Sequence, residues 1–281
     1  MSIPFSDIQK QTNDLLGRDF YHLSQGSIDI KSTAPNGVNF TVKGKTGKDN
    51  SINASIESKY TDKASGLTLT QGWNNANSLD TKIELSELLT PGLKTELITS
   101  LVPNGNRNAK LNFYYQHSIV NTRLFFDLLK GPLTTADLTF NHDGFIVGGE
   151  LGYDISSAKV NKYNVGLGYK NPLYSIGLTA SNNLSVFSAA YYHKISPLVE
   201  AGAKATWDSV KSSNVNVEFA TKYKLDSSSS IKAKISDSGL TALSYQQVLR
   251  PGVTLGLGAS FDALKLSEPV HKLGFSLSFA A

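Results

Sequence analysis

The sequence contains no cysteine, which excludes a disulfide framework and thiol chemistry. Long hydrophobic runs are also absent, since no stretch is both long and apolar enough for a membrane helix of about 20 residues. The uncharged stretch 173–192 comes closest in length, but it contains Asn182 and Asn183 and alternates in polarity. We therefore predict strands and a hairpin there. The chain does not begin with a basic segment followed by an apolar run, so we expect no secretory signal.

Charged residues are few, and the sequence shows no motif for catalysis, metal binding or phosphate binding. Charged residues make up 18% of the 281 residues, the formal net charge is +4, and the basic residues are scattered. We therefore expect no nucleic-acid partner, while a preference for anions is allowed. The five histidines lack partners at metal-ligand spacing. The run Lys43-Gly44-Lys45-Thr46 resembles the end of a phosphate-binding loop, but the first glycine of that motif would fall on Asn39. Without a nucleophile–base pair, we predict no enzyme, no metal and no cofactor.

What the chain has is one repeated pattern, which runs from about residue 26 to the last residue. In the final segment, Leu273, Phe275, Leu277 and Phe279 alternate with charged, small or hydroxylic residues. Side chains of a strand point alternately to opposite faces, so each such segment has one apolar and one polar face. Turn signals separate the segments, among them Pro35-Asn36-Gly37, Gly131-Pro132 and Pro251-Gly252.

The number of segments predicts the architecture. The roughly 255 residues that carry the pattern provide for about 17–23 strands with short hairpin loops, and the segments themselves number about 19. Side chains cannot fill so wide a barrel, so the polar face should line a water-filled lumen and the apolar face should meet lipid. Gly166, Gly168, Gly256 and Gly258 are expected to face inward. A soluble all-β protein, such as a β-propeller, remains the alternative.

The first 25 residues differ from the rest. Ser2 and Pro4 could begin a helix of about 14 residues that ends at Gly17, with Phe5, Ile8, Thr12, Leu15 and Leu16 on one face. This helix is too short and too polar to cross a bilayer, so it should lie against an apolar or amphipathic surface. We therefore divide the chain into an amphipathic helix with its linker, residues 1–25, and a transmembrane β-barrel, residues 26–281.

Several motifs resemble those of one family. They are Phe5–Ile8, Leu15–Phe20, Tyr223–Asp226, Ile231–Leu240 and Glu268–Phe279. Together they are similar to the eukaryotic mitochondrial porins, the voltage-dependent anion channels, and look closest to the fungal members. The resemblance implies a 19-stranded barrel, an antiparallel meander closed by one parallel pair of strands, with the helix inside the pore. The parallel pair would be about Ser27–Thr33 against Lys272–Phe279.

The resemblance also implies a function and a location. We expect a voltage-gated, weakly anion-selective channel in the mitochondrial outer membrane, through which ions, phosphate, ADP and ATP diffuse. The implied partners are membrane lipids, the permeating anions and nucleotides, the outer-membrane sorting and assembly machinery, and further copies of the chain. A porin-fold paralogue that acts mainly in assembly or lipid handling, and a soluble β-barrel binding protein, are the alternatives.

Alternation and the resemblance together assign the candidate site residues. Fixed charges on the polar face bias permeation, although pairing across strands would weaken their field. The candidate pore-lining and selectivity residues are Lys10, Arg18, Lys31, Lys43, Lys45, Lys59, Lys82, Lys94, Lys110, Arg123, Lys204, Lys222, Lys232 and Lys234. The family resemblance adds a nucleotide contact at Gly92, Leu93 and Lys94, and a membrane-assembly signal at Lys272, Gly274, Leu277 and Phe279. Animal members often carry a glutamate where this chain has Gln71 on the lipid face, which puts regulation through that acid in doubt.

Overall fold

The structure is a computed structural model that describes residues 2–47, 51–87, 90–103, 105–129, 133–211, 214–268 and 271–280. The predicted turn at Gly131-Pro132 lies outside the described residues. Three short helical elements precede the strands: η1 (Phe5–Asp7), α1 (Lys10–Gly17) and η2 (Tyr21–Leu23). The strands are β1 (Gly26–Thr33), β2 (Asn39–Thr46), β3 (Ile52–Asp62), β4 (Leu67–Asn74), β5 (Leu79–Ser86), β6 (Leu93–Leu101), β7 (Arg107–Gln116), β8 (Val120–Asp127), β9 (Leu133–His142), β10 (Phe145–Asp154), β11 (Lys159–Lys170), β12 (Tyr174–Ser181), β13 (Val186–Lys194), β14 (Val199–Asp208), β15 (Val215–Lys224), β16 (Ser229–Ser236), β17 (Leu240–Arg250), β18 (Val253–Asp262) and β19 (Lys272–Ala280).

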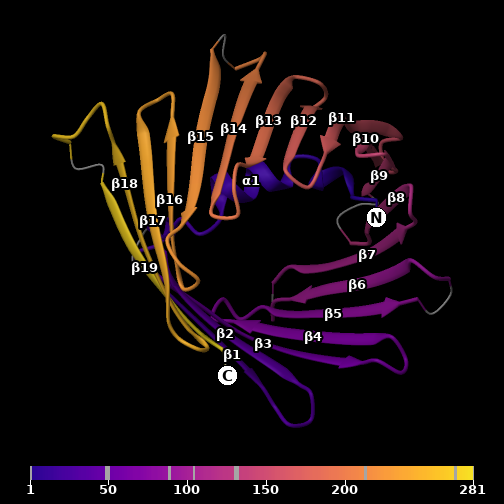
Figure 1. Cartoon of the computed structure of the whole chain (residues 1–281). Helices are drawn as coiled ribbons and strands as arrows, with labels where there is room; N and C mark the ends of the chain where they lie inside the picture. The colour runs from indigo at the N-terminus through magenta and orange to yellow at the C-terminus, as the bar shows by residue number, and fades with distance from the viewer. Residues whose placement is uncertain are drawn as a thin grey trace.

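The strands form a closed barrel. Within the described residues, nineteen strands make one sheet in which each strand pairs with the next along the chain (Figure 1). All consecutive pairs are antiparallel, and β1 closes the sheet against β19 in parallel, with Gly26 opposite Phe275 and Ile30 opposite Phe279. An odd number of alternating strands leaves the first and last pointing the same way, so the parallel seam follows from the count. The fold class predicted from the sequence is confirmed.

The two faces of the barrel differ as the alternation predicts. On β16, Ile231 and Ile235 point outward and are exposed, while Lys232 between them is only 5% exposed. Exposed apolar residues recur on the outer face of every part of the sheet, including Trp73 and Trp207. Gln71 lies on this outer face between the exposed side chains of Leu69 and Trp73, as expected. A barrel with this surface is matched to a lipid environment, because soluble proteins rarely expose so much contiguous apolar area.

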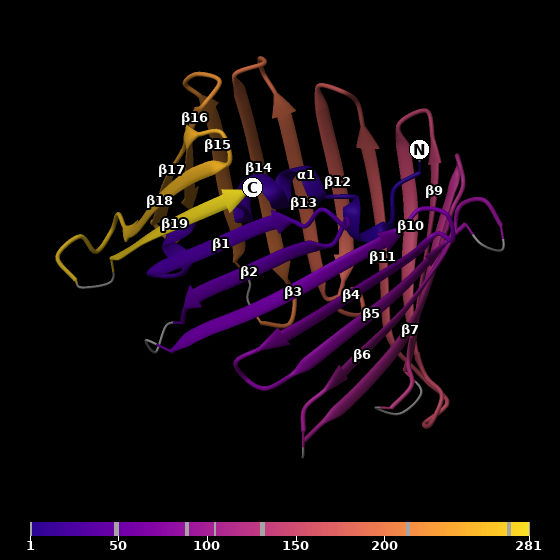
Figure 2. The ribbon, with the colours of Figure 1, turned by 90° about the horizontal axis from the view of Figure 1, so that it is seen from below.

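The N-terminal segment, residues 2–25, lies inside the ring of strands (Figures 1 and 2). The prediction of one helix of about 14 residues is wrong: η1 and α1 are separate, with Ile8 and Gln9 between them. Ser2 does not cap a helix, because its hydroxyl donates instead to the carbonyls of His117 and Val120 in the wall. The break at Gln9 occurs where its side-chain amide donates to the carbonyls of Gly177 and Ser188, both at 3.1 Å. Among the described residues, the helices are too short to cross a membrane.

Candidate functional site: the inner wall of the barrel

A series of very small residues on the inner face of β10 to β19 receives the N-terminal segment. We call it the docking track, and its members are Gly148, Gly166, Gly168, Gly177, Ala190, Gly202, Ala220, Ala242, Gly256, Gly258 and Gly274. Register links many of them directly, since Gly168 faces Gly177, Gly177 faces Ala190, and Gly202 faces Ala220. At Gly166, a β-carbon would lie only 2.9 Å from Cδ1 of Ile8. The track is thus small because the segment occupies the space that side chains would fill.

Four apolar side chains of the segment are buried against this wall. Ile8, Leu15, Leu16 and Phe20 are each at most 5% exposed. Leu15 and Leu16 pack with Ala220, which is completely buried. Burying such a side chain contributes about 1.5–3 kcal/mol, so the four together stabilise docking by roughly 6–12 kcal/mol before the cost of ordering the segment.

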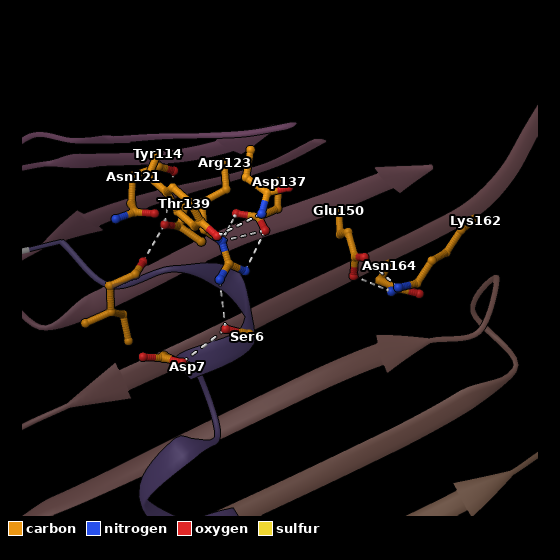
Figure 3. A network of polar contacts seen from close by, with 12 residues as sticks. Ser6, Asp7, Tyr114, Asn121, Arg123, Asp137, Thr139, Glu150, Lys162 and Asn164 are labelled. Atoms are coloured by element: carbon orange, nitrogen blue, oxygen red, sulfur yellow. Dashed lines mark hydrogen bonds and ion pairs between the residues drawn. The ribbon is translucent and has the colours of Figure 1, made fainter. Parts of the chain in front are cut away.

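Polar contacts fasten the beginning of the segment to β8 and β9 (Figure 3). The guanidinium of Arg123 donates through Nε to both carboxylate oxygens of Asp137, at 3.0 and 2.8 Å, and through Nη1 to the hydroxyl of Ser6 at 3.2 Å. Thr139 donates to the carbonyl of Ile3 at 2.5 Å. Asp137 is only 3% exposed, so it fixes Arg123 as a structural link between wall and segment. Arg123 therefore lines the wall with its charge already matched.

A cluster of four charged side chains on β5 and β6 is also internally paired. Lys82 contacts the carboxylates of Glu84 and Glu96, both at 3.1 Å. Lys94 pairs with the same two carboxylates, and its distance to Glu96 is 2.7 Å. Tyr114 donates to Glu96 at 2.9 Å. These two lysines consequently contribute little net field, and Lys94, the charged member of the predicted nucleotide contact with Gly92 and Leu93, is held by two carboxylates.

Further predicted pore-lining charges contact the segment or a neighbouring strand. Lys204 donates to the side chain of Asn13 at 2.8 Å, and Lys234 pairs with Glu218 at 3.1 Å. Lys232 donates to the carbonyl of Arg18 at 2.7 Å. The segment's own charges pair locally, Lys10 with Asp7 at 3.0 Å and Arg18 with Asp14 at 2.9 Å.

The remaining predicted charges divide into two groups. Lys110 lies opposite Asp127 in the register, and Lys222 lies between Glu200 and Lys232. Lys31, Lys43, Lys45 and Lys59 are exposed on the inward positions of β1 to β3. Lys43 lies opposite Asp29 in the register, but none of the four forms an ion pair with any described residue. We call these four the free lysine group. Figure 1 shows β1 to β3 on the opposite side of the ring from α1. Positive charge open to the lumen is thus concentrated on the wall that the segment leaves uncovered.

The linker between α1 and β1 is packed beneath β18 and β19. The ring of Tyr21 fills the space beside Gly256, and a β-carbon at Gly258 would lie 2.8 Å from the backbone nitrogen of Tyr21. Burial, and secondarily the Asp19 carboxylate, raises the pKa of Tyr21 to about 12. Burial lowers the pKa of His22, and the positive charges of Lys234 and Lys272 lower it further. Both rings are therefore neutral near pH 7 while the linker is docked.

The predicted membrane-assembly signal occupies β19. Leu277 and Phe279 are on its outward positions, and Lys272 and Gly274 are on its inward positions. Packing alone explains why position 274 is glycine, because the carbonyls of Tyr21 and Ser24 lie where a β-carbon of this residue would be. Whether these residues direct assembly stays a prediction.

Some of this site was visible in the sequence and some was not. Alternation places the charged residues on the inner face, and the four glycines Gly166, Gly168, Gly256 and Gly258 were expected there. The pairing of Arg123 with Asp137 depends on register between strands, which composition does not reveal. The docking role of the track was missed, although inward glycines on several consecutive segments were the available signal.

Comparison with known proteins places the chain among relatives over its full length. The family model described as "Eukaryotic porin" matches residues 2–274. The chain is 76% identical over 277 residues to the "Mitochondrial outer membrane protein porin" of Candida albicans, covering 99% of this chain and 98% of that protein. It is 49% identical over 285 residues to "Non-selective voltage-gated ion channel 1" of Saccharomyces cerevisiae, covering 100% of both chains. A solved mutant of the Rh. blastica porin shares the fold, with a TM-score of 0.54 at 10% identity over 84% of this chain and 97% of that one.

Proposed function

Because this chain belongs to the eukaryotic porin family, we propose that it forms a water-filled channel for ions and small hydrophilic metabolites in the mitochondrial outer membrane. The relatives' names support both the channel and the location, since they describe mitochondrial outer membrane porins and voltage-gated ion channels. An outer face of exposed apolar residues argues against the soluble binding protein considered as an alternative. Voltage gating comes from the relatives rather than from any local motif of this chain.

One observation carries the proposal of an open lumen. Lys43, Lys45 and Lys59 point inward from β2 and β3, yet they are exposed. An inward side chain keeps solvent exposure only where the interior is not filled. The N-terminal segment covers the wall from β8 to β19 and leaves β1 to β3 open to the lumen.

The free lysine group supports a weak anion preference. Most other inward lysines are matched by carboxylates or by the segment. The excess positive charge therefore lies mainly with Lys31, Lys43, Lys45 and Lys59, which outnumber the inward carboxylates of the same strands, Asp29 and Glu57. A small excess of exposed positive charge raises the local concentration of anions without excluding cations. The preference is therefore modest, in keeping with relatives that are named non-selective. Phosphate, ADP and ATP are the proposed anionic metabolites.

Three finer assignments remain proposals. The division into residues 1–25 and 26–281 follows the boundary between the lumenal segment and the strands. A nucleotide contact at Gly92, Leu93 and Lys94 would require a phosphate to compete with Glu84 and Glu96 for the ammonium. Contacts with the sorting and assembly machinery, and between copies of the chain, would use the exposed outer face or β19. No enzymatic activity is proposed.

Reconstitution into planar bilayers tests the channel. We expect large conductance steps in potassium chloride and, in a salt gradient, a reversal potential showing higher permeability for chloride than for potassium. Voltages of either sign should close the channel partly. Folded protein that inserts into the bilayer but gives no conductance would refute the proposed function and favour the paralogue that acts in assembly or lipid handling.

A further inference from the structure

The carboxyl end of α1 is held by one buried lysine. The last carbonyls of a helix lack partners within the helix. Here Lys232 of β16 donates through Nζ to the carbonyl of Arg18 at 2.7 Å. At 3.4 Å it also donates to the carbonyl of Asp14, which already accepts from the backbone N–H of Arg18. The same ammonium lies 3.9 Å from a carboxylate oxygen of Asp19. A cation at this end of a helix also matches the negative end of the helix dipole.

The residues that follow α1 complete the contact. The ring of Phe20 is 4% exposed, and the ammonium of Lys232 lies 5.1 Å from its centroid. The hydroxyl of Ser244, the register partner of Lys232 on β17, donates to the carbonyl of Asp19 at 2.5 Å. The polar and aromatic contacts of Lys232 thus converge on residues 14–20 of the segment.

The position of Lys232 in the wall is also informative. It faces Ser244, and Ser244 faces Gly258, so a long side chain stands beside the small residues of the docking track. It remains only 5% exposed because the segment covers it. Lys43, in contrast, is exposed and forms no ion pair with any described residue. Two lysines of the same inner wall therefore differ in their surroundings, since the segment covers Lys232 and leaves Lys43 exposed.

We propose that Lys232 is a positioning residue that holds the carboxyl end of α1 on the docking track, and that it is not one of the charges that select ions. This inference rests on the proposed channel function, because it concerns which inward charges of that channel select ions. The docked segment itself, however, is measurable without any conductance.

The absence of cysteine makes a clean labelling experiment available. Thr12→Cys introduces one thiol at a side chain that is 1% exposed in the docked state. Gly17→Cys introduces one at an exposed position, where an added β-carbon would contact nothing within 4 Å. The full chain, refolded in lipid vesicles and checked by circular dichroism, is treated with a small water-soluble methanethiosulfonate reagent. The labelling rate at position 12, divided by the rate at position 17, reports undocking.

The expected results separate the two kinds of lysine. Lys232→Met should label position 12 about tenfold faster than the parent, because the charged hydrogen bonds to α1 are lost. Lys232→Arg, which keeps a donor and a positive charge, should restore slow labelling. Lys43→Met, the matched control, should label at the parental rate and should shift the reversal potential more than Lys232→Met does.

Two outcomes would overturn the proposal: a parental labelling rate in Lys232→Met, or equal shifts in reversal potential for the two methionine variants. If Lys232→Met does not refold, Phe20→Leu decides, because it removes the aromatic face beside the ammonium while keeping apolar bulk. It should accelerate labelling about threefold, as expected for the loss of the cation–π contacts with Lys232 at 5.1 Å and Lys234 at 5.9 Å, and an unchanged rate would count against the proposal. A parent channel without conductance would refute the channel function and leave the labelling result standing.

Discussion

Reversing three charges of the free lysine group should invert the ion preference of the channel. The variant is Lys43→Glu with Lys45→Glu and Lys59→Glu, which changes the formal net charge from +4 to −2. All three side chains are exposed on the inward face of β2 and β3. None forms an ion pair with a described residue, so their replacement breaks no ion pair that the structure shows.

The magnitude follows from Coulomb's law with screening. A unit charge about 10 Å from a permeating ion in water contributes about 0.4 kcal/mol, which falls to roughly 0.15 kcal/mol at 0.1 M salt. Each reversal counts twice, so three reversals change the energy of one ion by about 0.9 kcal/mol. Because chloride and potassium respond with opposite signs, the energies of the two ions diverge by about 1.8 kcal/mol, and their permeability ratio should change by about twentyfold.

The assay is the reversal potential in a gradient of potassium chloride across a planar bilayer. A control variant reverses Lys63, Lys211 and Lys265, which lie between strands and change the net charge by the same amount. Lys211 and Lys265 form exposed ion pairs with Asp208 and Glu268, at 3.7 and 3.5 Å, and such exposed pairs contribute little to stability. The control should leave the reversal potential close to that of the parent. Equal shifts in both variants, or no shift in the wall variant, would refute the assignment of selectivity to the free lysine group.

Three further predictions concern the segment and its supports. Asp137→Asn should lower the free energy of unfolding in urea by about 3–5 kcal/mol, because it leaves the half-buried Arg123 without its carboxylate, and a loss below about 1 kcal/mol would contradict this. Gly258→Leu should displace the linker and speed hydrogen exchange in residues 20–25, whereas Gly44→Leu, at a site with open space, should not. Docking should be strongest above about pH 6.5 and weaken below it. Docking lowers the pKa of His22, so the undocked segment binds the proton more readily and protonation favours undocking. His22→Gln should abolish this pH dependence of the labelling rate at position 12 divided by the rate at position 17.

The fold could be read from the sequence because every strand repeats the same two-faced pattern. The alternation of Leu273, Phe275 and Leu277 defines an outward face without any knowledge of neighbouring strands, and counting such segments limits the width of the barrel. The inner wall was less predictable. Lys43 and Lys232 look alike in the sequence, since each alternates with apolar neighbours, but one is exposed to the lumen and the other is covered by the segment.

The helix was predicted too long for a related reason. Periodicity placed Ile8, Thr12, Leu15 and Leu16 correctly on one buried face. It could not show that Gln9 bonds to carbonyls of β12 and β13, where η1 and α1 separate. Contacts between residues more than 160 positions apart decide that detail, and local propensity carries no information about them.

The parallel seam between β1 and β19 sets an order on the folding of the barrel. Gly26 and Phe275 are neighbours in the sheet but lie at opposite ends of the strand series, so this pairing has the greatest loop-closure cost of any in the sheet. Every other strand pair joins adjacent segments and can form earlier. The linker packs under Gly258 and Gly274 beside this seam, so sealing the wall and seating the segment should occur as one late event. Until then the chain carries two unpaired edges, which are sites for wrong pairing with another copy.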